Sequence, residues 1–196
     1  MRHPFLCSSA LVPGFVVLSG LVAGHVQAEP VTYVIEPTHT FATFEIGHFG
    51  TSTNRARFDR KEGTVIFDRV AKTGKVDVTI DATSVNSGTP LFDKHLQEED
   101  FFNTARFPTI HFSSDAFRFQ GDKVSEVVGK LTLLGKTEPV TLKATQFNCY
   151  DSPILKREVC GGDFETVIDR TRWGMNYGPT YPKNVRLIIQ VEAVRQ

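Results

Sequence analysis

Apolar and polar residues alternate with a period of two along most of the chain after residue 30. The clearest example lies in the first half of the segment 39–58, where every second position from 42 to 48 is apolar except for one histidine. That face carries Ala42, Phe44, Ile46 and His48. A period of two is typical of a strand with one buried and one solvent-facing side. Two glycines and a run of Thr, Ser and Asn then predict a turn, and a more basic strand leads to Phe58.

Similar strand patterns recur at regular intervals as far as the end of the chain. They occupy residues 31–35, 63–68, 75–82, 110–113, 117–119, 127–133, 140–144, 164–168 and 185–194. Turn residues separate them, which is typical of an all-β barrel or sandwich. Because neighbouring patterns can belong to one bent strand, we expect about eight strands.

One segment departs from the strand pattern. Thr89 and Pro90 are typical of the start of a helix, and apolar residues then recur at helical spacing up to about residue 100. The sequence therefore predicts a short helix near residues 91–99, between two groups of strands.

The start of the chain has the pattern of an export signal. A basic first segment precedes an apolar run over residues 5–22, and small residues precede a cleavage site between Ala28 and Glu29. We expect residues 1–28 to be a signal peptide and residues 29–196 to form one domain. An uncleaved membrane anchor is the alternative, although a proline within the run favours a cleaved segment.

Composition and charge narrow the classes of function. The chain has 22 basic and 22 acidic residues, and this balance gives no electrostatic argument for binding nucleic acid. It has 16 Phe but only 4 Tyr and 1 Trp. Such a bias indicates a large apolar interior or an apolar cavity.

Candidate catalytic and metal-binding residues are sparse. The chain contains no Gly-x-Ser-x-Gly, no His-Glu-x-x-His and no phosphate loop, so we expect no catalytic residue. His39 and His48 have opposite parity in a strand and share a face only across a bulge, so we expect no metal site. His48 lies on the apolar face, where it can hydrogen-bond a quinone or phosphate head group. A buried structural role is the alternative.

Basic residues cluster after the predicted turn. They are Arg55, Arg57, Arg60 and Lys61. Near the mouth of a barrel they would attract a pyrophosphate or a membrane surface. A solvated strand face is the more ordinary interpretation, and the same holds for Arg170 and Arg172.

Two cysteines, Cys149 and Cys160, remain once the signal peptide is removed. In an exported chain, two cysteines on either side of a loop that contains a proline are typical of a disulfide. A metal site or a reactive thiol is the alternative.

Longer motifs carry more information than the strand pattern. In chain order they are His39-x-x-Ala-x-Phe-x-Ile-x-His48-x-Gly-x-Ser52, Ser84-Val-Asn-Ser-Gly88, Asp93-Lys-His-Leu96, Phe101–Pro108, Gly129–Leu142, Arg170-x-x-Trp-Gly-Met175 and Val-Glu-Ala193. Together they resemble the signatures of the YceI-like, polyisoprenoid-binding proteins over nearly all of residues 29–196. The chain departs from the family pattern at Asn54, Ala56, Phe92 and Arg172. Asn54 and Phe92 affect the expected polarity of the pocket, not the expected fold.

The resemblance implies an extended, eight-stranded, antiparallel, lipocalin-like β-barrel in the bacterial periplasm. It also implies that the lumen holds a long polyisoprenoid, an isoprenoid quinone or a similar amphiphile, without an enzymatic reaction and without a cofactor other than the bound lipid. Transient contact with an inner-membrane b-type cytochrome is a further implication, and a homodimer is kept open. Two alternatives remain: an enzyme of the same shape with His48 or His95 as acid or base, and a structural stress-response protein with a filled barrel.

Binding of an isoprenoid tail requires apolar surface, since such a tail offers almost nothing to hydrogen-bond. Each buried methylene-sized group contributes about 0.8 kcal/mol. Inward residues are therefore the candidate ligand-binding residues, although ordinary core packing is the alternative for each. The candidates are Phe44, Ile46, His48, Phe58, Val78, Ile80, Phe112, Leu131, Leu133 and Leu142, with Phe101, Phe102 and Phe107 near the helix end.

Overall fold

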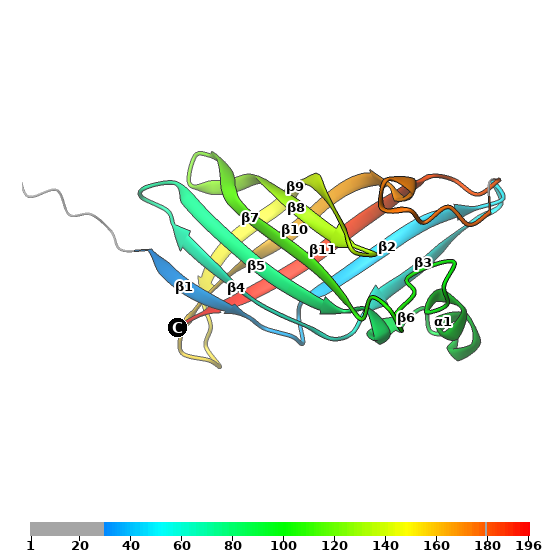
Figure 1. Ribbon diagram of the computed structural model, residues 1–196. Helices are drawn as coiled ribbons and strands as arrows, with labels where there is room; N and C mark the ends of the chain where they lie inside the picture. The colour runs from blue at the N-terminus through cyan, green and yellow to red at the C-terminus, as the bar shows by residue number, and fades with distance from the viewer. Residues whose placement is uncertain (1–29, 179) are drawn as a thin grey trace, which may run out of the picture.

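The computed structural model of the protein describes residues 30–178 and 180–196. The expected signal peptide, residues 1–28, and its cleavage site lie outside these residues. Most of the described chain is extended and winds into an elongated barrel (Figure 1). No helix within these ranges is long and apolar enough to cross a membrane.

Strands dominate the secondary structure. They are β1 (Val31–Ile35), β2 (Phe41–His48), β3 (Ser52–Phe58), β4 (Lys61–Asp68), β5 (Thr73–Asp81), β6 (Val85–Asn86), β7 (Thr109–Gln120), β8 (Lys123–Leu133), β9 (Lys136–Asp151), β10 (Glu158–Asp169) and β11 (Asn184–Arg195). The helical elements are α1 (Pro90–Leu96) and two 3-10 turns at Ala82–Ser84 and Arg170–Trp173.

The barrel closes where β1 pairs with β11, and every pairing is antiparallel. β1 and β2 lie one after the other along β11, and β4 and β3 pair with them in turn. β1 and β2 therefore act together as one bent strand of the barrel, and β3 and β4 act together as another. The result confirms the predicted all-β fold and the predicted eight-stranded antiparallel barrel.

The bend between β1 and β2 is fixed by a contact with the last strand. The Thr40 hydroxyl donates to the Glu192 carbonyl and accepts from the Glu192 N–H, both at 3.1 Å. This side chain replaces ladder hydrogen bonds between the two strand segments. The Glu192 N–H and carbonyl therefore both have a partner at the bend.

The predicted strands at 110–113 and 117–119 form one strand, β7, with an irregularity between Ser113 and Ala116 in its pairing with β8. The Ser114 hydroxyl donates to the Val128 carbonyl at 2.7 Å and accepts from the Ala116 N–H at 3.1 Å. A bulge of this kind bends a strand without ending it.

Helix α1 starts where the sequence predicts, with Thr89 as its N-cap and proline in the first turn, but it ends at Leu96, before residue 99. The chain turns back because the Phe102 N–H donates to the Leu96 carbonyl at 3.0 Å and the Thr104 N–H donates to the Gln97 carbonyl at 3.1 Å. This turn brings the Phe101–Phe102 pair toward the barrel. The short strand β6 pairs with β3, so the segment that contains β6 and α1 covers the barrel beyond the end of β5 (Figure 1).

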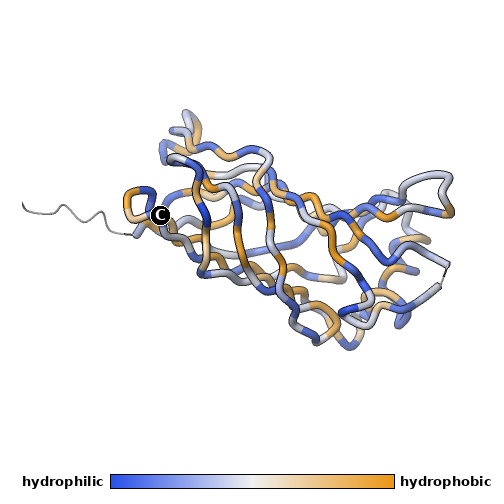
Figure 2. Tube along the Cα trace, turned by 90° about the horizontal axis from the view of Figure 1, so that it is seen from above, coloured by the Kyte–Doolittle hydropathy of each residue, from blue (hydrophilic) through white to orange (hydrophobic). Residues whose placement is uncertain are grey.

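Apolar and polar residues alternate along the strands, as the colours in Figure 2 show. The end of the barrel near the start of β1 and the C-terminus is closed by aromatic packing. The Phe67 ring lies 5.9 Å from the Phe119 ring and 5.7 Å from the Phe147 ring. At the opposite end lie α1 and the β2–β3 turn (Figure 1).

Candidate ligand-binding cavity

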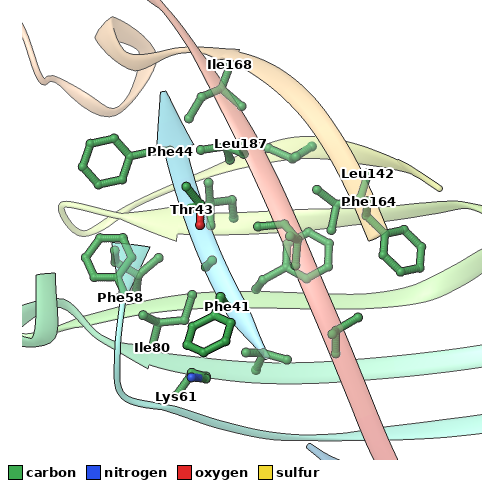
Figure 3. A pocket seen from close by; sticks show the side chains of 18 of the residues that line it. Phe41, Thr43, Phe44, Phe58, Lys61, Ile80, Leu142, Phe164, Ile168 and Leu187 are labelled. Atoms are coloured by element: carbon green, nitrogen blue, oxygen red, sulfur yellow. The ribbon is translucent and has the colours of Figure 1, made fainter. Parts of the chain in front are cut away.

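A cavity of about 350 Å³ lies inside the barrel, and residues from every barrel strand line it. Its volume falls within the range of small-molecule sites, roughly 300–1,000 Å³. Most of the lining side chains are apolar, and Figure 3 shows several of them directed into the same space. The barrel is therefore hollow and is not filled by its own side chains.

Strand alternation accounts for the lining. On β5, Val76, Val78 and Ile80 line the cavity, whereas Asp77 and Thr79 between them do not. Among the residues predicted from the sequence, those that line the cavity are Phe44, Ile46, His48, Phe58, Val78, Ile80, Phe101, Phe102, Phe112, Leu131, Leu133 and Leu142. A single internal surface therefore brings these side chains together, although they come from segments far apart in the chain.

Phe107 is the exception and is not a lining residue, so that prediction is wrong. Its N–H donates to the Asn103 carbonyl at 2.8 Å in a tight turn. The turn directs the ring onto the β8–β9 connection, where a ring carbon lies 2.8 Å from the position that a Cβ on Gly135 would occupy. Gly135 has a positive φ of 71°, which suits a residue without a Cβ, and the absence of that atom makes room for the ring.

Other lining residues were not selected from the sequence, although most lie on strands that the sequence predicted. They include Tyr33, Ile35, Phe67, Val127, Val140, Phe147, Phe164, Ile168, Val185, Leu187, Ile189 and Val191. Their inward period of two was the signal that would have found them. Tyr177 and Tyr181 also line the cavity, but they lie between the 3-10 turn Arg170–Trp173 and β11, in a segment without any period.

The cavity is closed at one end and open at the other. Tyr33, Phe67 and Val124 at the closed end are only 2–4% exposed. At the other end the lining residues His48 and Tyr177 are partly or largely exposed. We call this end the mouth, and it consists of residues 47–51, 90–103, 174–178 and 180–183.

A continuous series of aromatic contacts crosses the mouth. The His48 and Phe49 rings are 4.7 Å apart, and Tyr181 lies 4.9 Å from Phe49. Tyr181 is 6.4 Å from Tyr177, which in turn lies 5.1 Å from Phe101. Three separate segments thus meet through ring contacts, and these pairs contribute beyond simple burial.

Arg170 fixes the position of one side of the mouth. The sequence indicates a solvated residue, but Arg170 is 5% exposed and lines the cavity, so that interpretation is wrong. Its Nε donates to the Pro182 carbonyl at 3.0 Å, Nη1 to Met175 at 2.5 Å, and Nη2 to Tyr177 at 2.9 Å and to Gly178 at 3.5 Å. One guanidinium therefore holds the backbone near the start and near the end of the mouth segment 174–183, at Met175 and at Pro182.

Most of the basic residues after the β2–β3 turn form exposed ion pairs. Arg55 pairs with Glu45, Arg57 with Asp59, and Arg60 with Asp81, at 2.6–2.8 Å. Arg172 likewise pairs with Glu138 at the surface. These residues form the solvated faces that the ordinary interpretation predicts.

Lys61 differs from this group because it lines the cavity. Its Nζ lies 4.3 Å from the centre of the Phe41 ring, and the Arg57 guanidinium lies 4.4 Å from the same ring. Figure 3 shows Lys61 close to Phe41. Burial lowers the pKa of Lys61, because the charged form loses hydration there.

The histidines of the described residues lie in separate environments. His39 pairs with Glu36 at 2.7 Å, whereas His48 lies at the mouth between aromatic rings. Within the described residues, the one group of three metal-ligand side chains is Cys149, Glu158 and Cys160, and both of its cysteines are oxidised.

The disulfide predicted between Cys149 and Cys160 is present. The two cysteines stand directly opposite each other on β9 and β10. Cys160 also lines the cavity. Nearby, the Tyr33 hydroxyl donates to the Glu158 carboxylate at 2.5 Å, and burial together with this carboxylate raises the pKa of Tyr33 to about 12.

Comparison with known proteins agrees with this architecture. The sequence model of one family, described as the YceI-like domain, matches residues 33–193. Protein YceI of Escherichia coli O157:H7 is 37% identical over 164 residues, which cover 82% of this chain and 84% of that protein. Protein YceI of Salmonella arizonae is 36% identical with the same coverage.

Solved structures share the fold. The YceI protein of Campylobacter jejuni superposes with a TM-score of 0.68 at 25% identity, over 77% of this chain and 90% of that chain. A polyisoprenoid binding domain from Saccharophagus degradans, implicated in plant cell wall breakdown, has a TM-score of 0.63 at 14% identity, over 85% of this chain and 99% of that chain.

Proposed function

Because this chain belongs to the YceI-like family, we propose that it binds an amphiphile with a long polyisoprenoid tail in its barrel and carries it through the periplasm. The observation that carries this proposal is the hollow interior of about 350 Å³, apolar along its length, closed at one end and open at the other. The Saccharophagus degradans relative, described as a polyisoprenoid binding domain, supports the same class of ligand.

The cavity suits a featureless tail. Each methylene-sized group that leaves water contributes about 0.8 kcal/mol, so a few isoprene units offset the cost of association. Phenylalanine rings supply much of the lining, and Phe44, Phe58 and Phe102 contact one another with ring centres 5.2–6.0 Å apart. Such rings present broad apolar surfaces without a hydrogen-bonding group that the tail would leave unsatisfied.

The mouth suits an uncharged head group better than a pyrophosphate. Its polar lining side chains are imidazoles and phenols, from His48, His95, Tyr177 and Tyr181, and the cationic lining residue Lys61 lies outside the mouth. The guanidinium of Arg170 is already engaged by carbonyl groups of the mouth segment. An isoprenoid quinone, with a flat ring and two carbonyl acceptors, is therefore our specific candidate for the ligand.

The export pattern of the sequence and the disulfide support a periplasmic location. We propose binding and release without chemical change of the ligand, and no resident cofactor. Contact with an inner-membrane b-type cytochrome and formation of a homodimer remain predictions.

The first test is organic extraction of protein purified gently from the periplasm, followed by mass spectrometry. We expect an isoprenoid amphiphile in an amount approaching one molecule per barrel. Extracts that contain no amphiphile would overturn the proposal.

A matched pair of variants tests the location. Val78→Trp places an indole inside the cavity, whereas Thr79→Trp places the same group on the outer face of the same strand. We expect the first variant to lose bound lipid and the second to retain it. Phe44→Asp, which puts a charge into the apolar lining, should also abolish retention. Full retention by folded Val78→Trp and Phe44→Asp proteins would contradict a cavity site.

A further inference from the structure

The mouth carries apolar and aromatic side chains that remain largely exposed despite their contacts within the barrel. Phe49 is 63% exposed at the β2–β3 turn, and Leu91 is 80% exposed in the first turn of α1. Tyr177, 42% exposed, stands on the third segment of the same mouth. Tyr177 lines the cavity, and the β2–β3 turn and α1, which carry Phe49 and Leu91, lie at the end of the barrel opposite the start of β1 and the C-terminus (Figure 1).

The β2–β3 turn holds Phe49 in a conformation that favours glycine. Phe49 has φ 50° and Gly50 has φ 71°, and the Thr51 N–H donates to the His48 carbonyl at 3.0 Å. A bulky residue in the left-handed region costs free energy, of order 1 kcal/mol. The ring contacts the rings of His48 and Tyr181, but the residue remains 63% exposed, so the barrel gains only part of the burial that a phenylalanine can provide. A role outside the folded chain accounts for a phenylalanine at this position.

From these observations we infer that the mouth docks on a phospholipid bilayer, with Phe49 and Leu91 inserted among the lipids and Tyr177 at the level of the head groups. The inference rests on the proposed function, because an isoprenoid tail would have to pass between a membrane and this opening. Uncharged side chains such as Phe49 and Leu91 can enter a bilayer surface without the free-energy cost of removing water from a charge. Tyrosine is enriched at the membrane–water interface.

The charges near the mouth decide which lipid surface is suitable. Lys94 lies beside Leu91 on α1 and Lys183 is exposed on the third segment of the mouth, but Glu98, Glu99 and Asp100 are exposed just beyond the helix and outnumber these cations. Attraction to anionic lipid is therefore weak, and apolar insertion supplies the binding. We therefore expect the mouth to dock on a bilayer of zwitterionic phospholipids.

Fluorescence provides a direct test, because the chain has one tryptophan and Trp173 is 1% exposed. Phe49→Trp places a reporter at the mouth. Ile154→Trp places one at the opposite end, in the β9–β10 turn, where Ile154 is 87% exposed. Each mature variant is mixed with phosphatidylcholine vesicles, with and without a lipid brominated on its acyl chains.

We expect the emission of Phe49→Trp to shift to the blue and to be quenched by the brominated lipid, while Ile154→Trp is unaffected. The double variant Phe49→Asp/Leu91→Asp should reduce the vesicle-bound fraction at least about tenfold, whereas Ile154→Asp leaves it unchanged. No spectral change for Phe49→Trp, or equal quenching of both reporters, would overturn the inference; a protein partner for this surface would give the first of these results.

Extraction of the same preparations separates this inference from the proposed function. An amphiphile in a protein that ignores vesicles overturns membrane docking and leaves lipid carriage standing. Vesicle contact through Phe49 by a protein that never contains an amphiphile supports docking and overturns lipid carriage.

Discussion

Replacement of Arg170 by methionine tests how the mouth is held in place. Methionine has a comparable length and is apolar, so the substitution removes the guanidinium while much of the packing volume is kept. Four backbone carbonyls on residues 175–182 then lose their donor. Hydrogen bonds from a charged group contribute about 1.5–3 kcal/mol each, but carbonyls near the surface can bind water instead. We therefore expect a loss of about 3 kcal/mol in the free energy of unfolding.

Urea titration gives the measurement. For a domain of this size the urea slope is about 2 kcal/mol per molar, so the midpoint should fall by about 1.5 M. The fluorescence of Trp173, which lies in the same 3-10 turn as Arg170, reports the environment next to the mouth, and circular dichroism reports the barrel. Arg170→Lys keeps the charge but cannot reach all of the carbonyls, so it should recover only part of the loss.

Arg172→Met is the matched control, because Arg172 belongs to the same turn but forms an exposed pair with Glu138. Exposed pairs contribute about 0–1 kcal/mol, so this midpoint should move little. Equal midpoints for Arg170→Met and Arg172→Met would refute the view that the buried guanidinium anchors the mouth segment.

Three further predictions concern stability. Burial alone would raise the pKa of Glu36. Hydrogen bonds from Thr38 and His39 outweigh burial, so the pKa of Glu36 is lowered from 4.5 to about 2. Glu36→Gln should therefore lose about 1–2 kcal/mol near neutral pH. That stabilisation is present above the unfolded-state value of 4.5 and is lost as the pH falls toward 2, so a difference in urea midpoint that persists in acid would count against it. The native protein should show no free thiol after denaturation, and Cys149→Ala/Cys160→Ala should lose about 3 kcal/mol in urea; two titratable thiols in the native protein would exclude the bridge. Gly161→Ala should lose about 2 kcal/mol or more in thermal or urea unfolding, because its Cβ would lie 2.1 Å from the Val191 carbonyl oxygen, and a wild-type midpoint would contradict this.

The lining of the cavity could be predicted from the sequence because the direction of a strand side chain is a local property. Once Val78 and Ile80 are assigned to a strand, their shared face follows from the period of two. Closure of the barrel then places each inward face on the same cavity. Neither step requires knowledge of which strands are neighbours.

The bends and the buried arginine could not be predicted in this way, because contacts remote in sequence determine them. The bend after β1 depends on the Thr40 hydroxyl and the backbone of Glu192, 152 positions away. Arg170 is buried because a segment that ends at Pro182 folds over it and supplies carbonyl groups. The prediction that Phe107 lines the cavity is wrong for a more local reason, since one tight turn determines the side of the chain on which its ring lies.

The mouth shows why the two parts of the site differ in what the sequence reveals. His48, Phe101 and Tyr177 come from three segments, two of them without regular structure near the aromatic residue, and only the barrel topology brings them together. The tail-binding surface is thus specified by strand alternation, on which the stability of the barrel also depends. Access of the lipid to the cavity is specified by loops that carry exposed residues such as Phe49. Because Phe49 is 63% exposed, its substitution removes fewer internal contacts than substitution of a buried lining residue. Substitutions at the mouth should therefore change the rate of lipid exchange with little effect on unfolding, whereas substitutions of the lining, such as Phe44→Asp, should change both retention and stability.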